Sequence, residues 1–306
     1  MTSELSPFIA GTNIQYAWDS TSSGWLLDCA RKYQLMMIEG WDTKEHALDL
    51  YFGIMYGRAL EYYDRLRTDG MNYEDSVIFV VRMLLTETYG YKGWIEGNNN
   101  KTRETLIRSV IWYLEEFKDD PFETYILQES GKPAVELSFK LQLDYAPTGY
   151  SDQPYMLTGH LDRVVNFSGG LYVTDRKTTK STISSDYFSR FDLDNQMDIY
   201  TFAANIVFKA PVKGVVIDGA QIAVGFTRFA RGLTYRTPAQ TEEFFRDFKI
   251  YLRQAEGYAK DNYWPMNKKS CFLCPFKRVC SKDPAVRNAM LESDFVRRTW
   301  NPLQVR

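Results

Sequence analysis

Residues 159–179 read GHLDRVVNFSGGLYVTDRKTT, and this stretch decides how the middle of the chain folds. Its apolar and polar residues alternate, which predicts two strands, over 155–167 and 171–177. The Ser168-Gly169-Gly170 segment between them is typical of a tight turn between antiparallel strands. The sequence therefore predicts a β-hairpin at the centre of the chain.

Polar side chains gather on this hairpin. Side chains two positions apart on a strand share a face, so Asp175 and Lys177 point to one side and Arg176 to the other. Asp162 lies on the neighbouring strand, so two carboxylates and an ammonium group can converge. Oxygen ligands of this kind suit Mg²⁺ or Mn²⁺. Taken alone, the D-x-K pattern is a weak signal, and a surface pair of charges on a strand is the better explanation of it.

The flanking sequence supplies helices before the hairpin and a mixture of helix and strand after it. Helical patterns cover 22–36, capped by Ser22 or Ser23, and then 43–67, 73–89 and 101–117. A strand is expected at 134–145, a helix at 187–208, strands at 214–227 and 233–236, and a helix from Pro238 to residue 262, capped by Thr237. This order predicts an α/β or α+β fold with the sheet in the middle.

No segment divides the chain convincingly, so we expect one domain over 1–306. Its expected parts are a helical N-terminal part at 20–120, a sheet core at 121–262 and a cysteine-rich segment at 263–306. No apolar run is long enough to cross a bilayer, and the N-terminus lacks the features of a signal peptide. We therefore expect a soluble, cytoplasmic protein without a membrane partner.

Composition is that of a globular protein, with 306 residues of which 44% are hydrophobic and 25% charged. The net charge of −2 argues against a uniformly basic nucleic-acid binder. Residues 228–306 nevertheless hold 16 of the 37 Lys and Arg residues and only 8 of the 39 Asp and Glu residues. This basic quarter can offer a local surface to phosphates, although a solvated charged helix explains it equally well.

Several other polar residues indicate a function only when they are considered together, in their order along the chain. In chain order the set resembles the RecB-like nucleases of the PD-(D/E)XK superfamily, which show G-x-x-x-H/E on a helix, a Glu on a strand, G-x-x-D, D/E-x-K-T and Q-x-x-x-Y. The matching residues here are Gly57 with Glu61, Glu136, Gly159 with Asp162, Asp175-Arg176-Lys177-Thr178, and Gln196 with Tyr200. The resemblance covers roughly 22–280, and many members carry His where Glu61 stands.

The resemblance implies a restriction-endonuclease-like core, with a mixed central sheet flanked by helices, and metal-dependent hydrolysis of DNA. Asp162, Asp175, Glu61 and the Arg176 carbonyl would bind Mg²⁺ or Mn²⁺, and Lys177 would orient the attacking water. Gln196 and Tyr200 would support Lys177 or hold the substrate backbone, and His160 and Glu136 are possible substrate contacts. Nothing resembles a base-reading module, so we expect an exonuclease acting on single strands or duplex ends.

Four cysteines form a second pattern: Cys271, Cys274 and Cys280 as C-x2-C-x5-C, and Cys29 far upstream. In a reducing compartment they suggest metal ligands or inert core thiols rather than disulfides. The spacing is atypical for structural zinc, and four thiolates suit a [4Fe–4S] cluster. Zinc and free thiols stay open as alternatives.

The same cysteine arrangement resembles that of AddB-type and CRISPR-associated nucleases of this superfamily. The resemblance implies a structural [4Fe–4S] cluster that closes the N-terminal and C-terminal segments of the chain together. Metal binding that requires the folded arrangement would add to folding free energy.

Two alternative functions are compatible with this sequence. The chain could be a non-hydrolytic protein that binds DNA ends as a recombination accessory, although such a protein has no need of D-x-K opposite a second carboxylate. It could also be a nuclease subunit that is active only within a larger helicase or integrase assembly, with recombination, replication or repair proteins as partners. No Walker A sequence occurs, so the sequence encodes no evident motor.

Overall fold

The computed structural model describes residues 5–44, 48–94 and 99–304. The chain divides into two compact units, each gathered from distant parts of the sequence. We call one the terminal unit (Met1–Glu45, Ser138–Gly159 and Pro238–Arg306) and the other the sheet unit (His46–Leu137 and His160–Thr237). Because the two units are interleaved along the chain, the single domain expected over 1–306 stays a prediction.

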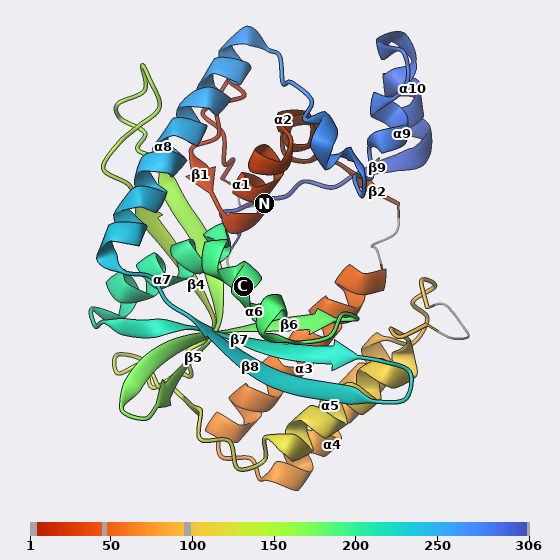
Figure 1. Cartoon of the computed structure of the whole chain (residues 1–306), viewed down its shortest axis with the longest axis vertical. Coiled ribbons are helices and arrows are strands. Elements are labelled where there is room, and N and C mark those ends of the chain that lie inside the picture. The colour runs from red at the N-terminus through yellow and green to blue at the C-terminus, as the bar shows by residue number, and fades with distance from the viewer. Residues whose placement is uncertain (1–4, 45–47, 95–98, 305–306) are drawn as a thin grey trace. The chain divides into compact units, whose positions relative to one another are not determined.

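A mixed sheet forms the centre of the sheet unit (Figure 1). The part of β5 (Met156–Phe167) that belongs to this unit pairs antiparallel with β6 (Gly170–Thr179). Strand β6 runs parallel to β7 (Val212–Ile222), and β7 pairs antiparallel with β8 (Thr227–Thr234). The short strand β3 (Glu123–Thr124) also pairs with β5. The predicted α/β fold with a mixed central sheet is confirmed.

The turn between β5 and β6 has the geometry that the sequence predicts. Ser168 and Gly169 both have positive φ, at 48° and 74°. A two-residue turn with positive φ at both positions matches the right-handed twist of the strands it joins. The hairpin is therefore fixed locally, which sets the register of β5 against β6.

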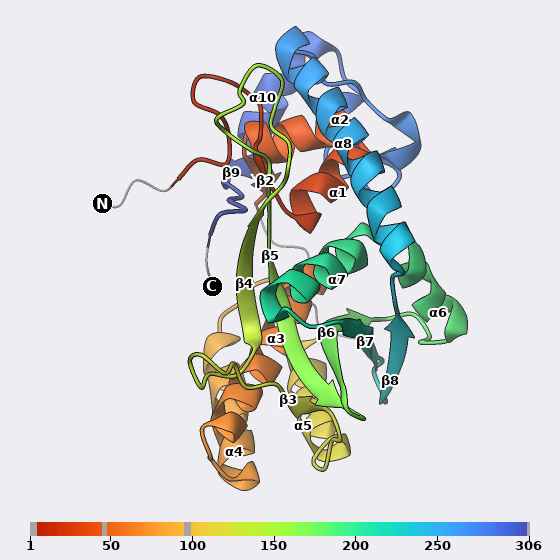
Figure 2. The same cartoon turned by 90° about the vertical axis from the view of Figure 1, so that its left-hand side faces the viewer.

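Helices cover both faces of this sheet (Figure 2). On one face lie α3 (Leu48–Thr68) and α5 (Arg103–Glu116), with α4 (Tyr73–Glu87) packed against both. On the other face lie α6 (Ser185–Ser189) and α7 (Asn195–Phe208). The helix expected from residue 43 begins at Leu48 in the described part of the chain, and residues 45–47 lie outside it.

The core of this layer consists of apolar side chains from α3, α4 and α5 packed against the end of β7. Its buried members are Phe52, Met55, Tyr56, Ala59, Leu60, Val80, Leu84, Leu106, Val110, Tyr113, Leu114, Ala220 and Ile222. Polar side chains cap several of the helices, and at the start of α4 Asn72 accepts a hydrogen bond from the Asp75 amide. The apolar stripes of the helices therefore fix their positions on the sheet.

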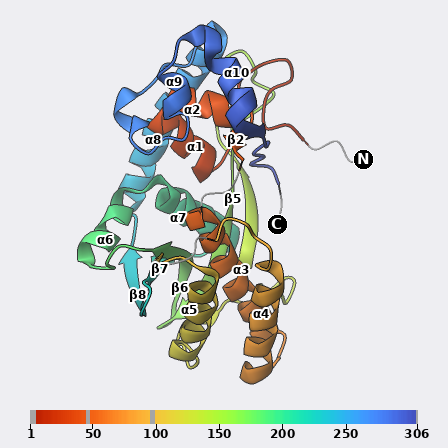
Figure 3. The same cartoon turned by 90° about the vertical axis from the view of Figure 1, so that its right-hand side faces the viewer.

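The terminal unit combines both ends of the chain (Figure 3). Its N-terminal elements are β1 (Ala17–Trp18), which runs parallel to the start of β5, then α1 (Ser20–Asp28), α2 (Ala30–Tyr33), η1 (Gln34–Ile38) and β2 (Trp41–Thr43). Its C-terminal elements are α8 (Pro238–Asp261), η3 (Lys268–Cys271), α9 (Lys277–Cys280), α10 (Pro284–Asp294) and β9 (Phe295–Arg297). None of the described helices is long and apolar enough to cross a membrane.

Two details of the terminal unit differ from the sequence prediction. The helix expected over 22–36 is broken at Cys29, whose backbone is extended (φ −168°, ψ 116°). The capping residue is Asp19, which accepts from the Ser22 amide, so Ser22 takes the third helical position. The antiparallel pairing of β9 with β2 was not predicted, because both strands are only three residues long.

Helix α6 is held on the sheet by one aromatic ring that fits against two glycines. A Cβ atom built at Gly232 would lie 2.3 Å from the Phe188 ring, and one at Gly219 would lie 3.4 Å from it. Gly232 pairs with Ile217 and Gly219 pairs with Ala230, so the two glycines are diagonal neighbours on one face of β7 and β8. The two glycines therefore leave the space that Phe188 occupies, and this contact anchors the segment that leads into α7.

We predict that Gly232→Ala lowers the free energy of unfolding by roughly 1–3 kcal/mol, because the added methyl group overpacks the Phe188 site. Urea denaturation of both proteins measures the difference. Gly225→Ala is the matched control, since a Cβ atom at Gly225 meets nothing within 4 Å. Equal stability of the Gly232→Ala and Gly225→Ala proteins would contradict this account of the contact.

Candidate active site

Two carboxylates meet on the hairpin of β5 and β6. Arg163 pairs with Thr174, so the antiparallel register, continued by one residue, places Asp162 opposite Asp175. The Arg176 amide donates to Asp162 Oδ2 at 3.0 Å. Asp175 is buried, with 1% of its surface exposed. The alternation predicted from the sequence thus brings both carboxylates to one face of the hairpin.

Lys177 is held between this pair and helix α7. Its Nζ lies 2.9 Å from Asp175 Oδ1 and 2.8 Å from Asp175 Oδ2. The same Nζ donates to Gln196 Oε1 at 2.9 Å, and Gln196 Nε2 donates to the Tyr200 hydroxyl at 2.9 Å. Gln196 and Tyr200 are one turn apart on α7, so they face the same side. Lys177 therefore has a fixed position.

Burial and mutual attraction set the ionisation of these groups. Burial raises the pKa of Asp175 to about 7, although Lys177 acts in the opposite direction. Burial also lowers the pKa of Lys177, but the Asp175 and Asp162 carboxylates outweigh this effect, and the pKa is raised above its ordinary value. Lys177 thus stays protonated at neutral pH, while ionised Asp175 lacks sufficient compensating charge.

A divalent cation fits this shortage of positive charge. Asp175 Oδ2 is buried, and its contact with Lys177 Nζ at 2.8 Å is an ion pair that uses only one of its lone pairs, so a further lone pair is free for a cation. Bound Mg²⁺ or Mn²⁺ would compensate Asp175 and Asp162 together. Within the described part of the chain, however, no group of three or more His, Cys, Asp or Glu side chains is placed to hold a metal ion.

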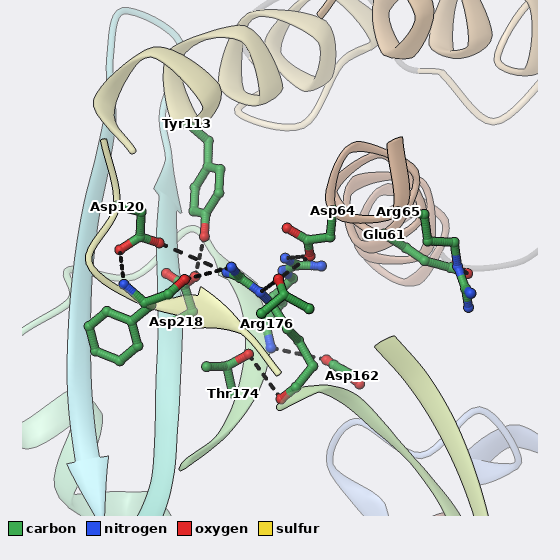
Figure 4. Close-up of polar contacts among 12 residues, drawn as sticks. Glu61, Asp64, Arg65, Tyr113, Asp120, Asp162, Thr174, Arg176 and Asp218 are labelled. Atoms are coloured by element: carbon green, nitrogen blue, oxygen red, sulfur yellow. Dashed lines mark hydrogen bonds and ion pairs between the residues drawn. The ribbon is translucent and has the colours of Figure 1, made fainter. Parts of the chain in front are cut away.

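Glu61, the expected third carboxylate, is engaged elsewhere on α3 (Figure 4). Its Oε1 accepts from Arg65 Nε at 3.0 Å, and Arg65 Nη2 donates to the Val135 carbonyl at 3.0 Å. Glu61 would have to leave Arg65 before it could bind a metal ion. Its role as a ligand therefore stays a prediction, as does that of the Arg176 carbonyl.

The two predicted substrate contacts lie on strands near the carboxylates. His160 is half-buried on β5, two residues before Asp162, and so shares its face. Glu136 lies on β4 (Val135–Gln142), which pairs with β5, and has a positive φ of 49°. Such a backbone is strained for a residue other than glycine, and strain of this kind clusters at functional sites. The Tyr200 hydroxyl lies near the same carboxylates. Burial raises its pKa, and the negative charges of Asp162, Asp175 and Glu136 raise it further.

Behind the carboxylates lies a buried network of opposite charges that the sequence analysis missed. Arg163 and Arg176 directly follow Asp162 and Asp175 in the chain, so they point to the opposite face. There Arg176 Nη2 donates to Asp64 Oδ2 on α3, and Arg163 Nε lies 3.6 Å from the same oxygen (Figure 4). Both strands that carry the carboxylates are therefore tied to α3.

The network continues across the sheet to β7 and β8. Asp120 lies 3.9 Å from Arg163 and forms two hydrogen bonds of 2.7 Å with Arg231. Arg231 Nε is 3.5 Å from Asp218 Oδ1, and Asp218 accepts a hydrogen bond from the Tyr113 hydroxyl. Three arginines thus face three aspartates, and the set carries no net charge. A sequence signal existed in the repeated Asp-Arg pair at 162–163 and 175–176.

Asp194 is another residue that the sequence analysis missed. It caps α7, and its Oδ1 accepts from the Gln196 amide at 2.8 Å. Its charge adds to those acting on Asp175 and Lys177. The segment before α7 therefore contributes both the position of Gln196 and a third negative charge near Lys177.

All four cysteines line one small pocket of the terminal unit. Cys29 Sγ accepts from the Asn267 amide at 3.2 Å, and Cys271 Sγ lies 3.7 Å from the Asn267 carbonyl. Burial raises the pKa of Cys274 and Cys280, with smaller contributions from neighbouring thiols. Residues more than two hundred positions apart are thus brought together, although the described thiols do not form a ready-made metal-binding group.

Comparison with known proteins agrees with the geometry. A family model described as "PD-(D/E)XK nuclease superfamily" matches residues 24–281. Comparison with curated proteins gave no match. Among solved structures, a protein from Eubacterium rectale described as "Putative exonuclease" is 12% identical, with a TM-score of 0.51, over 90% of this chain and 92% of that one. SSO0001 is 14% identical over 73% of this chain and 84% of that one, with a TM-score of 0.32.

We predict that Asp64→Leu lowers the free energy of unfolding by about 3–5 kcal/mol, because it leaves Arg176 buried without its carboxylate. Arg176→Met should cost less, because Asp64 keeps its 3.6 Å contact with Arg163. The double variant should lose less than the sum of the two single losses, since the pair is then removed as a whole. Urea denaturation of the four proteins measures the cycle.

The control for this cycle is Glu242→Ala, which breaks the ion pair with Arg246. These side chains are 69% and 75% exposed, so the cost should stay below about 1 kcal/mol. Additive losses in the double variant would contradict the pairing of Asp64 with Arg176.

Proposed function

Because the chain belongs to the PD-(D/E)XK nuclease superfamily, we propose that it is a metal-dependent DNA exonuclease with a structural iron–sulfur cluster. The observation that carries the proposal is the convergence of Asp162, Asp175 and Lys177 on the β5–β6 hairpin. A protein that only binds DNA ends has no use for a buried carboxylate beside a fixed lysine. This argues against the non-hydrolytic alternative.

Asp162 and Asp175 would bind Mg²⁺ or Mn²⁺, with the Arg176 carbonyl and water completing the shell. The bound ion would polarise the phosphoryl oxygen and acidify a water molecule. On the protein side, the Arg176 amide orients Asp162 through its hydrogen bond to Oδ2. Strand β6 would thus supply one of the two carboxylates and a backbone carbonyl, and its Arg176 amide would hold the other carboxylate in place.

Lys177 would act as a hydrogen-bond donor and not as a general base. Its pKa is raised by the adjacent carboxylates, so it carries its proton at neutral pH. A protonated amine beside Asp175 can position the attacking water and stabilise negative charge that develops on the phosphate. Gln196 and Tyr200 hold Lys177 through two hydrogen bonds of 2.9 Å, and we assign them this supporting role.

DNA is the proposed substrate, and strand ends are the proposed point of attack. The fold is shared with a protein described as an exonuclease, which supports the assignment at the level of fold only. Cleavage could depend on a helicase, integrase or other partner protein. The purified chain therefore provides the first test.

The pocket lined by Cys29, Cys271, Cys274 and Cys280 supports the proposed [4Fe–4S] cluster. Four thiolates are the ligand set that such clusters prefer. Lys32 lines the same pocket, and its cation would offset part of the negative charge of thiolate ligands. The cluster would fasten the break between α1 and α2 to the segment around η3 and α9, as a structural staple within the terminal unit.

We predict that Lys177→Ala lowers DNA cleavage roughly 100- to 1000-fold, because one fixed donor to the developing charge is lost. Tyr200→Phe should cost about 10-fold, since it only loosens the support of Lys177. The assay uses end-labelled linear DNA with Mn²⁺ or Mg²⁺, and EDTA should stop the reaction.

Lys213→Ala is the control, because Lys213 is an exposed lysine at the start of β7, and its activity should equal that of the wild type. Covalently closed circles should survive conditions that degrade linear DNA. Wild-type rates for Lys177→Ala would remove Lys177 from the mechanism, and rapid nicking of closed circles would instead indicate an endonuclease.

For the cluster, we predict that anaerobically purified protein is brown and contains about four irons per chain. Cys29→Ala should lose iron as fully as Cys274→Ala and should lower the melting temperature. Ser270→Ala is the control, because Ser270 lines the same pocket but supplies no thiolate. Colourless protein that contains zinc and no iron would refute the cluster, and the nuclease assignment would survive.

A further inference from the structure

The segment Lys268–Lys282, which we call the cysteine loop, presents an unusual surface on the terminal unit. It carries five cations, Lys268, Lys269, Lys277, Arg278 and Lys282, and no Asp or Glu. All five cations are exposed, and in the described part of the chain none of them forms an ion pair. The loop is therefore a concentration of positive charge on a chain whose net charge is −2.

Two large apolar side chains stand among these charges. Phe272 is 83% exposed and Leu273 is 88% exposed. No other described phenylalanine is more than half exposed. Exposing such side chains costs roughly 1.5–3 kcal/mol each relative to burying them. Lys277 Nζ lies 6.0 Å from the centre of the Phe272 ring, so aromatic and cationic groups are side by side.

The exposed pair does not result from a loose segment. Phe276 is 1% exposed and stacks on Phe295, with ring centres 4.9 Å apart. Val279 is 2% exposed in the same apolar cluster. Before the pair, Asn267 caps η3 and donates to Cys29 through its amide. The chain is anchored on both sides, so Phe272 and Leu273 are held outward.

We propose that the cysteine loop binds single-stranded DNA, with Phe272 stacking on a base and the surrounding lysines contacting phosphates. Phosphates complement the five cations, and a base offers an apolar face to an exposed ring. An acidic protein would satisfy the charges, but single-stranded DNA alternates phosphates with planar bases and so matches the lysines and Phe272 together. The proposal rests on the proposed function, because it takes its ligand from the DNA on which a nuclease of this family acts.

The test measures binding without cleavage. Full-length protein in EDTA is titrated into a fluorescently labelled single-stranded oligonucleotide of mixed sequence, and anisotropy gives the dissociation constant. Phe272→Ala should weaken binding roughly 5- to 150-fold, the range found for the loss of one stacking residue. Phe272→Tyr keeps the ring and should bind like the wild type.

Charge is tested separately through salt dependence. Replacing Lys268 and Lys269 by alanine should reduce the slope of log affinity against log salt by about 1.4, at about 0.7 for each phosphate contact on a single strand. In cleavage assays with Mn²⁺, Phe272→Ala should raise KM and leave kcat unchanged. A purely structural role of Phe272 would instead lower the melting temperature.

Tyr89→Ala is the matched control, since Tyr89 is an aromatic residue of the sheet unit that is 81% exposed. It should bind DNA like the wild type. Unchanged affinity of Phe272→Ala, an equal loss in Tyr89→Ala, or binding of the loop to anionic vesicles in place of DNA would overturn the proposal. Because binding is measured without metal, a protein that binds through the loop but never cleaves would refute the proposed function alone.

Discussion

An ionised carboxylate that is as deeply buried as Asp175 must be compensated, because the protein interior solvates charge poorly. Lys177 supplies part of the compensation, and it must then itself be held in place. Gln196 does this, and Tyr200 holds Gln196, which fixes the rotation of α7 on the sheet. The position of α7 thus follows from the need to compensate one buried carboxylate. The part of the negative charge that Lys177 does not compensate can be balanced by a divalent cation.

The alternation of side chains on β5 and β6 extends this constraint to the back of the sheet. An arginine follows each of Asp162 and Asp175, so the hairpin has carboxylates on one face and guanidinium groups on the other. These arginines form ion pairs with aspartates on α3 and on the loop after α5. The two faces of the hairpin are therefore coupled through the backbone. The apolar layer beneath the site has to accommodate a neutral cluster of six charged groups.

Much of this arrangement could be predicted from the sequence, since it depends on local rules. The period of two on 155–167 and 171–177, with glycines at the turn, predicts the hairpin and the shared face of Asp162, Asp175 and Lys177. The ordered motifs add Gln196 and Tyr200 on α7. Asp64, Asp120 and Asp218 could not be predicted, because nothing local shows which aspartate on a distant element meets a buried arginine. The break at Cys29 was missed because the helical sequence pattern continues through it.

The division of the chain has a consequence for how the protein could be dissected. The sheet unit ends at Leu137, resumes at His160 and ends again at Thr237, so the chain leaves it within β4 and re-enters it within β5. The re-entry point lies two residues before Asp162. No terminal truncation can therefore isolate the nuclease sheet, and a minimal fragment would need a designed connection from Leu137 to His160. Residues 138–159 thus belong to the terminal unit although they interrupt the sheet unit in sequence, so neither unit is encoded by one continuous stretch of the chain.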